Sequence, residues 1–274
     1  MRRPASALTL RRPRTLKAAL AILADDPAVT PIAGCTDVFV GLHFDTLDRL
    51  HFVDLWGLDE LRGIRMSDGY LRIGALATYT ELLASSMVRR RVPMLAAAAG
   101  EVGGAQVQNR GTLGGNIANG SPAGDTLPVL AAANARIVLR RAGAERTVLF
   151  TEFFTGYRTS VRRPDELIVA IEIPRIVGRQ WWRKVGTRRA QAISKVMIAG
   201  VRGAGDVRVA VGSVAPTVVR ATAAEALLAA GASVPDAQAA LRAAIAPIDD
   251  IRSTGQYRLA VAANLLARFW SETS

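Results

Sequence analysis

The stretch QVQNRGTLGGNIANGSPAGD, from Gln106 to Asp125, stands apart from a chain that is otherwise rich in Ala, Val, Leu and Arg. Four glycines lie between Arg110 and Ser121, separated mostly by small polar side chains. Glycine lets backbone amides approach a ligand and tolerates positive φ, and successive amides in such a turn can bind an anion. Thr and Asn side chains add neutral donors for phosphate oxygens. We therefore expect a ligand-binding loop that lies outside the hydrophobic core.

Two familiar phosphate-binding motifs do not match this stretch. No Gly-Lys-Ser or Gly-Lys-Thr follows the glycines, which excludes a P-loop. No Gly-x-Gly-x-x-Gly connects a strand with a helix, which excludes the dinucleotide fingerprint of the Rossmann fold. An ordinary glycine-rich loop between two core elements remains the alternative.

The composition indicates a globular protein of two modest domains. The chain has 274 residues, half of them hydrophobic, but no apolar run of 18 residues that could span a membrane. The basic N-terminus superficially suggests a signal peptide. However, Leu16, Leu20 and Leu23 recur at helical spacing, so an amphipathic first helix and a cytoplasmic location are the expectation.

The net charge of +12 would suit nucleic acid or an acidic partner surface. Nearly all the basic residues are arginines, which indicates a compositional bias, and no basic stripe is interleaved with aromatic residues. We therefore expect no nucleic-acid partner. The single cysteine, Cys35, cannot hold an iron–sulfur cluster, and with His43 and His51 it lacks zinc spacing, so we expect no metal site.

Hydrophobic periodicity predicts an α+β protein. Thr78 and Glu81 are spaced as a capping box for a short helix. Helices are expected at 14–25, 78–85 and 92–102, and in three segments after residue 222; strands are expected at 29–33, 51–55, 70–75, 136–140, 146–150, 167–173, 180–185, 196–201 and 207–211. A boundary near Pro174–Gln180 would leave a small antiparallel sheet with helices on one face as the second domain.

A second turn of small residues, PIAGCTDV from Pro31 to Val38, follows the strand expected at 29–33. Read alone, it fits a plain strand–turn connection equally well. Together with RGTLGGNIANGSPAGD, and with RKVGTRRAQAISKV from Arg183 to Val196, it resembles the FAD-binding medium subunits of the molybdenum hydroxylases, the xanthine dehydrogenase and carbon monoxide dehydrogenase family. The resemblance covers nearly the whole chain.

This resemblance implies a two-part FAD-binding domain of the p-cresol methylhydroxylase-like type, followed by a C-terminal α+β domain. We expect the FAD-binding domain at 1–174, with a small α/β part at 1–50 and a larger sheet part at 51–174, and the C-terminal domain at 175–274.

The resemblance also assigns roles to residues in three segments. The first loop, around the FAD pyrophosphate, would comprise Pro31, Ile32, Ala33, Gly34, Cys35, Thr36, Asp37 and Val38. The second would contribute Thr112, Gly114, Gly115, Asn116 and Asn119. Asp125 would lie near the ribityl or ribose hydroxyls, Val102 and Gly103 near the isoalloxazine, Ile168 on the adenine side, and Lys184 near the ring or its phosphate. A solvated charge at a strand end is the alternative for Lys184.

Position 35 departs from the family, which most often has glycine there. Because Cys35 has a Cβ, we expect its φ to be negative and the loop geometry to differ slightly. The family holds FAD without a covalent bond, so a thioether to Cys35 is not expected.

The resemblance implies an electron-transfer subunit without catalytic acid or base residues. Iron–sulfur clusters in a small partner subunit would deliver electrons from a molybdopterin-binding large subunit to this FAD, which would reduce NAD or another acceptor. The alternatives are a self-sufficient flavin oxidoreductase of the related fold, which would need its own substrate pocket, and a basic nucleic-acid-binding module, which only the net charge supports.

Overall fold

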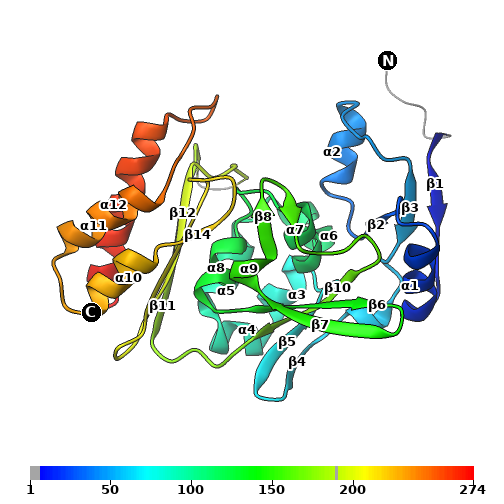
Figure 1. Ribbon diagram of the computed structural model, residues 1–274, viewed down its shortest axis with the longest axis horizontal. Coiled ribbons are helices and arrows are strands. Elements are labelled where there is room, and N and C mark those ends of the chain that lie inside the picture. Colours follow the sequence, from blue (N-terminus) through cyan, green and yellow to red (C-terminus); the bar gives the residue numbers. More distant parts are fainter. Residues whose placement is uncertain (1–6, 189–190) are drawn as a thin grey trace.

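The computed structural model describes residues 7–188 and 191–274, and its N-terminal unit begins with a small parallel sheet (Figure 1). The strands are β1 (Thr9–Arg11), β3 (His51–Asp54) and β2 (Thr30–Ile32), in that order, with helix α1 (Leu16–Asp25) following β1. Strand β3 pairs with both neighbours, so this sheet extends to Asp54, beyond the division expected at residue 50. Strand β1 was not predicted, because three exposed residues carry too little periodicity to identify a strand.

A five-stranded antiparallel sheet forms the larger part of the same unit. Its order is β4 (Ile64–Ser67), β5 (Tyr70–Gly74), β10 (Leu167–Ile173), β6 (Arg136–Arg141) and β7 (Ala144–Leu149). Beyond β7 the chain adds the short helix α9 (Phe150–Phe153) and the hairpin β8 (Phe154–Gly156) and β9 (Thr159–Ser160). The remaining elements of this unit are α2 (Val38–His43), the 3-10 helix η2 (Asp59–Leu61), α3 (Tyr79–Ala84), α4 (Ser86–Arg91), α5 (Pro93–Gly100), α6 (Ala105–Arg110), α7 (Leu113–Asn119) and α8 (Leu127–Ala132).

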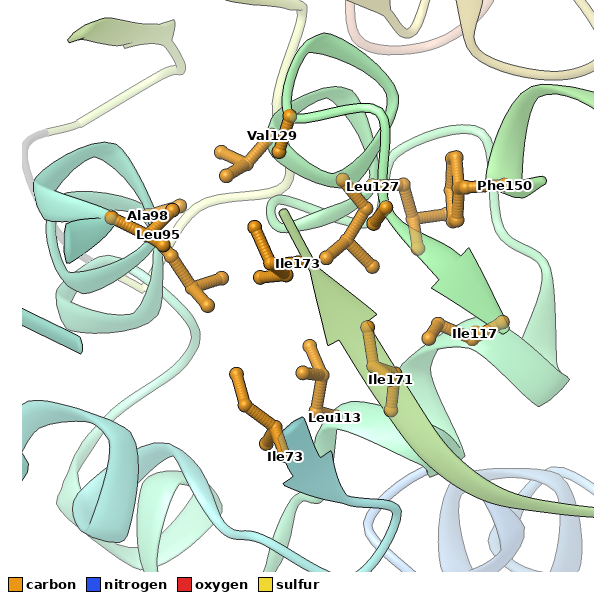
Figure 2. Close-up of a cluster of buried hydrophobic side chains, with 14 of the residues drawn as sticks. Ile73, Leu95, Ala98, Leu113, Ile117, Leu127, Val129, Phe150, Ile171 and Ile173 are labelled. Atoms are coloured by element: carbon orange, nitrogen blue, oxygen red, sulfur yellow. The ribbon is translucent and has the colours of Figure 1, made fainter. Parts of the chain in front are cut away.

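The hydrophobic core of this unit lies between the five-stranded sheet and its helices (Figure 2). Ile73 and Ile171 project from the strands toward Leu113 and Ile117 of the glycine-rich stretch. That stretch is therefore not a loop outside the core, as expected, but consists largely of α6 and α7. Glycine lowers helix propensity and led to the wrong prediction, and the buried contacts of Leu113 and Ile117 override it here.

The C-terminal unit is an antiparallel sheet with helices on one face, as predicted, but the sheet has four strands and only three were expected (Figure 1). The strands are β11 (Arg179–Val185), β12 (Val196–Arg202), β13 (Val207–Gly212) and β14 (Val219–Arg220), and the helices are α10 (Thr222–Ala229), α11 (Val234–Ala244) and α12 (Gly255–Glu272). The other face packs on the N-terminal unit, and its Trp182, Ala199 and Val201 belong to the same core as Ile73. The α+β class is thus confirmed.

Helix α5 lies along β11 and is attached to it at both ends. Gln180 Nε2 donates a hydrogen bond of 2.8 Å to Arg91 O, just before α5, and Lys184 Nζ donates one of 3.3 Å to Glu101 O, just after it. Gln180, Trp182 and Lys184 alternate along β11, so all three point toward the N-terminal unit. These contacts place Lys184 beside the glycine-rich stretch. In the described ranges, no helix is long and apolar enough to cross a membrane.

Candidate functional site

Gly34 of the first predicted loop lies against the backbone of Arg110, just before the second predicted loop. A Cβ on Gly34 would lie 1.7 Å from Arg110 O, a distance that no side chain can accommodate. The next residue, Cys35, has φ of +60°, so the expectation of a negative φ is wrong. Cys35 occupies the left-handed conformation that a glycine would adopt without strain. The substitution therefore keeps the turn and adds a side chain to it.

Backbone amides of the first loop are available to a ligand, whereas those at the start of α7 are not. Among the described residues, Thr36 N and Asp37 N have no intramolecular acceptor. By contrast, Gly114 N bonds to Ala75 O and Gly115 N to Thr112 Oγ1. An anion concavity built from the amides of Gly114 and Gly115 is thus contradicted, because the fold already uses both groups.

The two adjacent glycines differ in their surroundings. Gly114 is buried, and a Cβ there would lie 2.7 Å from both the Cβ and the carbonyl oxygen of Ala75. Gly115 is exposed, and its Cβ would approach only Thr112 Oγ1, at 2.8 Å. Gly114 is therefore required for packing, while Gly115 faces outward, where a ligand can reach it.

The polar side chains of the second segment have intramolecular partners. The hydroxyl of Thr126 donates to Asn116 Oδ1 at 2.7 Å, and Arg158 Nη1 donates to Asn119 Oδ1 at 3.0 Å. Thr112 caps α7 through its bond from Gly115 N. No described contact occupies the amide nitrogens of Asn116 and Asn119, so each keeps donors for a ligand.

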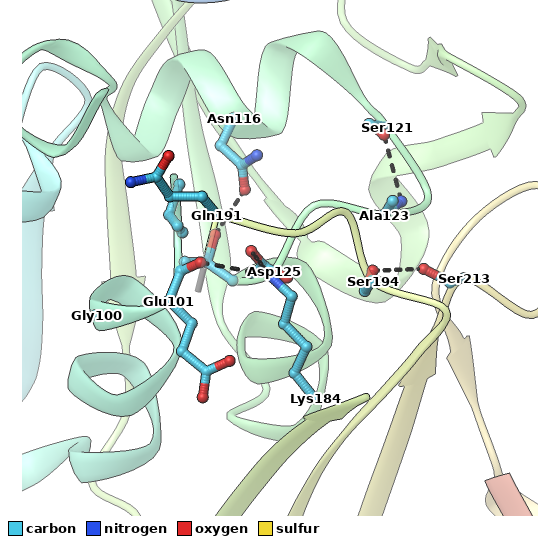
Figure 3. A network of polar contacts seen from close by, with 12 residues as sticks. Gly100, Glu101, Asn116, Ser121, Ala123, Asp125, Lys184, Gln191, Ser194 and Ser213 are labelled. Carbon is cyan, nitrogen blue, oxygen red and sulfur yellow. Dashed lines mark hydrogen bonds and ion pairs between the residues drawn. The ribbon is translucent and has the colours of Figure 1, made fainter. Parts of the chain in front are cut away.

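Asp125 and Lys184 form a buried ion pair between the two units (Figure 3). Lys184 Nζ lies 2.8 Å from Asp125 Oδ2, and only 4% of the lysine side chain is exposed, which excludes a solvated strand-end charge. Asp125 Oδ1 is buried without a partner among the described residues. Burial raises the pKa of Asp125 to about 6; Lys184 opposes the shift, and the carboxylate of Glu101 adds to it. A donor from a bound molecule would satisfy Oδ1.

The other predicted residues vary in what they offer a ligand. Pro31 and Ile32 lie on β2, followed by Ala33, while Val38 begins α2. Val102 packs partly against the core, and Gly103 turns the chain into α6 with φ of +53°. Ile168 is buried in the core of the five-stranded sheet and presents little surface to any ligand.

Three groups near these segments were missed by sequence reasoning. The Arg110 guanidinium lies 3.7 Å from the ring centroid of Trp56, at the contact between the first and second segments. Gln191 reaches across from the C-terminal unit, with Nε2 2.9 Å from the position of a Cβ on Gly104 (Figure 3). Arg158 contacts Asn119. Periodicity carries no signal for contacts between such distant residues, although Gln191 lies within the third resembling segment.

The Cys35 thiol is not activated. Partial burial raises its pKa, as does the nearby Asp54 carboxylate, while Arg110 opposes the shift. Because the thiolate is the nucleophile, a raised pKa disfavours covalent chemistry at Cys35.

Comparison with known proteins identifies the family. A model described as the FAD binding domain in molybdopterin dehydrogenase matches residues 6–176, and one described as the CO dehydrogenase flavoprotein C-terminal domain matches residues 182–273. The chain belongs to this family of FAD-binding flavoproteins. Because the first match covers more than half of the chain, the resemblance stated from the motifs is confirmed.

This flavoprotein is similar in sequence to subunits of two dehydrogenases. It is 38% identical over 164 residues to a xanthine dehydrogenase FAD-binding subunit of Escherichia coli O157:H7, a match spanning 60% of this chain and 56% of that one. It is 34% identical over 228 residues to the carbon monoxide dehydrogenase medium chain of Hydrogenophaga pseudoflava, spanning 80% and 79% of the two chains.

Solved structures agree with these matches. A carbon monoxide dehydrogenase chain from Hydrogenophaga pseudoflava aligns with a TM-score of 0.89 at 30% identity, covering 97% of this flavoprotein and 98% of that chain. A chain of quinoline 2-oxidoreductase from Pseudomonas putida 86 aligns with a TM-score of 0.89 at 26% identity, covering 97% and 96%.

Residues of the flavoprotein fit FAD. The unpaired amides of Thr36 and Asp37 suit a pyrophosphate. The buried, unpartnered Asp125 Oδ1 suits a hydroxyl or N–H donor, and Lys184 places a positive charge beside it. The close contact of Gly34 with Arg110 O holds the first two segments together.

Proposed function

We propose that the flavoprotein binds one FAD noncovalently across three segments, 31–38, 102–125 and 183–196, which we call the candidate site; residues 189–190 of the third segment lie outside the described residues. The observation that carries the proposal is the closure of the first segment onto the second at Gly34 and Arg110 O. The backbone amides of Thr36 and Asp37 would bind phosphate oxygens, the exposed Gly115 would let the ligand approach α7 closely, and Asp125 with Lys184 would bind the flavin end. The raised pKa of Cys35 supports noncovalent attachment.

We further propose that the chain is the electron-transfer subunit of a heteromeric molybdenum hydroxylase. FAD, when bound, supplies the capacity to accept single electrons and to pass on a pair. A small iron–sulfur subunit would deliver the electrons, a molybdopterin-binding large subunit would oxidise the substrate, and NAD would be an acceptor. The names of the relatives support this assembly, although the first of them is matched over only 56% of its length.

Within the candidate site, Lys184 acts as a fixed positive charge. Its burial and its contact with Asp125 hold the ammonium group in one place, where it favours negative charge that develops on a bound group. We also propose a domain division after residue 174, close to the end of the first family match at residue 176, and a cytoplasmic location, supported by the amphipathic α1 at the basic N-terminus.

A purified protein tests the binding proposal directly. It should be yellow, and acid precipitation should release all of the flavin into the supernatant. Flavin that remains in the pellet would contradict noncovalent binding, and a colourless protein that takes up no FAD would contradict the site itself.

Co-expression tests the role of the subunit. The lone chain should show no substrate hydroxylation, and the iron–sulfur and molybdopterin chains should together restore substrate-dependent flavin reduction. Full turnover of an aldehyde or N-heterocycle by the lone chain would instead identify a self-sufficient flavin oxidoreductase.

A further inference from the structure

A cleft of about 540 Å³ lies at the end of β11 opposite the candidate site. Its lining residues come from the end of α4, the start of α5, the segment 174–178 that connects the two units, and neighbouring strands. The lining residues are Leu71, Arg90, Arg91, Pro93, Ile173, Pro174, Arg175, Ile176, Gly178 and Gln180. None of them belongs to the candidate site, so the cleft requires an explanation of its own.

The cleft carries three positive charges without a counter-charge. Arg90, Arg91 and Arg175 are exposed, their side chains have no hydrogen-bond or ion-pair partner among the described residues, and no lining residue is acidic. Neighbouring arginines are occupied: Arg89 donates to Leu83 O and Ala84 O, and Arg179 donates to Ser274 O. Three like charges around one cleft repel each other, and a bound anion would relieve that repulsion.

A fourth polar group in the cleft also lacks a partner. Gln180 donates through Nε2 to Arg91 O, but its Oε1 is buried and accepts no hydrogen bond from the described residues. A buried acceptor without a donor is costly, so a ligand or water donor is expected there. Leu71 and Ile173 are almost fully buried, so the apolar surface next to these polar groups comes from Pro93, Pro174 and Ile176, which are at least partly exposed.

We propose that this cleft binds a phosphate-bearing small molecule of the nucleotide class. Arginine forks match phosphate oxygens in bidentate geometry, and three guanidinium groups around one cleft favour a multiply charged phosphate group over a single carboxylate. The small apolar surface of Pro93, Pro174 and Ile176 suits one face of a planar base, and the cleft volume falls within the range of roughly 300–1,000 Å³ that is usual for small-molecule sites. The proposal does not depend on the flavin assignment, because no lining residue is shared.

Calorimetric titration of the FAD-saturated protein with ADP tests the proposal, since saturation keeps ADP out of the flavin site. Arg90→Ala and Arg175→Ala should each raise the Kd of ADP by about tenfold, as expected for loss of a charge-assisted hydrogen bond of about 1.5 kcal/mol. Arg242→Ala, which removes the same charge from an exposed position on α11, is the matched control and should leave the Kd unchanged. All three positions are exposed, so the variants should fold, which circular dichroism would verify.

Two further ligands define the chemical class. Adenosine should bind at least tenfold more weakly than ADP, and pyrophosphate should bind more weakly than ADP but remain sensitive to Arg175→Ala. Adenosine that binds as tightly as ADP would overturn the phosphate assignment, and pyrophosphate that binds as tightly as ADP would overturn the nucleotide assignment. An unchanged Kd in the Arg90→Ala/Arg175→Ala variant, or no binding of ADP at millimolar concentration, would overturn the site. Repeating the titration without FAD separates this outcome from any failure of flavin binding.

Discussion

At the scale of the residue, Cys35 combines backbone strain in the folded protein with a lower conformational entropy of the unfolded chain than glycine would give. Cys35 adopts the left-handed conformation, which costs a residue with a Cβ about 1 kcal/mol. Glycine would remove this strain, but it would also increase the entropy of the unfolded chain by a comparable amount. The two effects oppose each other, so the family's usual glycine and this cysteine are close to equivalent in stability.

Replacement of Cys35 should separate these effects. Cys35→Gly should change the free energy of unfolding by less than about 1 kcal/mol and leave FAD content unchanged. Cys35→Val should destabilise the protein by more than about 1 kcal/mol, because a β-branched residue is strained at positive φ. Urea denaturation and the flavin-to-protein absorbance ratio measure both quantities. Loss of flavin in Cys35→Gly would show that the thiol itself contributes to binding.

Gly114 should tolerate no side chain, in contrast to a glycine elsewhere in the same unit. Gly114→Ala places a Cβ against Ala75 and should cost about 1–3 kcal/mol through overpacking. Gly100→Ala is the matched control, because its Cβ would meet only Leu83 Cδ2 at an ordinary 3.7 Å. Thermal and urea unfolding of the flavin-free proteins would compare them. Equal stability of the two variants would contradict the packing role of Gly114.

The raised pKa of Asp125 predicts how stability depends on pH. Because the folded pKa of about 6 exceeds the unfolded value of 3.8, the folded protein binds this proton more tightly. The resulting stability is fully present below pH 3.8 and is lost as the pH rises to 6. The wild type should therefore lose up to about 3 kcal/mol relative to Asp125→Asn over this range. Urea unfolding of flavin-free protein at several pH values measures the difference, and a constant difference would refute the shift.

At the scale of the element, helix α7 combines packing with ligand access. Leu113, Gly114 and Ile117 face the core, while Gly115 and Ala118 face outward. The helix starts at Thr112, whose hydroxyl accepts from Gly115 N, and ends at Gly120 in the left-handed conformation. One short helix therefore fixes the second segment of the candidate site, and its cap controls the orientation of the residues that face a ligand.

Removal of this cap should lower the free energy of unfolding of the flavin-free protein. Thr112→Ala should reduce the stability of the flavin-free protein by about 0.5–2 kcal/mol, the usual range for loss of an N-cap hydroxyl. Thr112→Ser keeps the hydroxyl and should stay close to wild type. Denaturation measures the stability, and equilibrium titration with FAD measures the affinity. A Thr112→Ala protein of unchanged stability with weakened FAD binding would assign Thr112 to the ligand alone.

Local patterns in the sequence identified elements of the fold, whereas conformations that depend on long-range contacts were not identified. The strand 167–173 and the capping box of Thr78 and Glu81 were predicted correctly, because alternation and caps are local patterns. The helical conformation of 105–110 and 113–119 was not predictable from propensity, since it depends on buried contacts with residues such as Ala75 and Ile171. The positive φ at Cys35 likewise has no local signal, and it occurs beside Gly34, whose contact with Arg110 joins residues far apart in the chain.

The candidate site was predictable only as far as its motifs extend. The three segments were identified from small-residue turns and from the family resemblance, but the side chains that join them were not. Gln191 and Trp56 contribute through contacts between residues far apart in the chain. The pairing of Lys184 with Asp125 required the position of β11 against α5, which no local pattern encodes.

At the scale of the whole molecule, the two units share one core. Trp182, Ala199 and Ala210 of the C-terminal sheet lie in the same cluster as Leu95 and Ala98 of α5. A second cluster, which contains Phe269 of α12, fills the far side of that sheet. The C-terminal unit is therefore not an appendage, since its sheet covers apolar surface of the N-terminal unit that would otherwise face water.

This shared core predicts cooperative unfolding of the entire chain. Thermal unfolding of the flavin-free protein should give one transition, with calorimetric and van't Hoff enthalpies in agreement. Gly200→Ala, which forces a Cβ to within 2.5 Å of the Phe269 ring, should lower the midpoint for both units together. Two separate transitions, of which Gly200→Ala shifts only one, would show that the units unfold independently.

The position of Trp182 gives the protein a built-in optical reporter. Its indole is buried between the units, two residues along β11 from Lys184 and on the same face of the strand. Flavins absorb light at the wavelengths that tryptophan emits, so a flavin held beside Lys184 would quench Trp182 by energy transfer. Emission would decrease as the site fills and recover as it empties, and the occupancy of the candidate site could be followed in real time without a label.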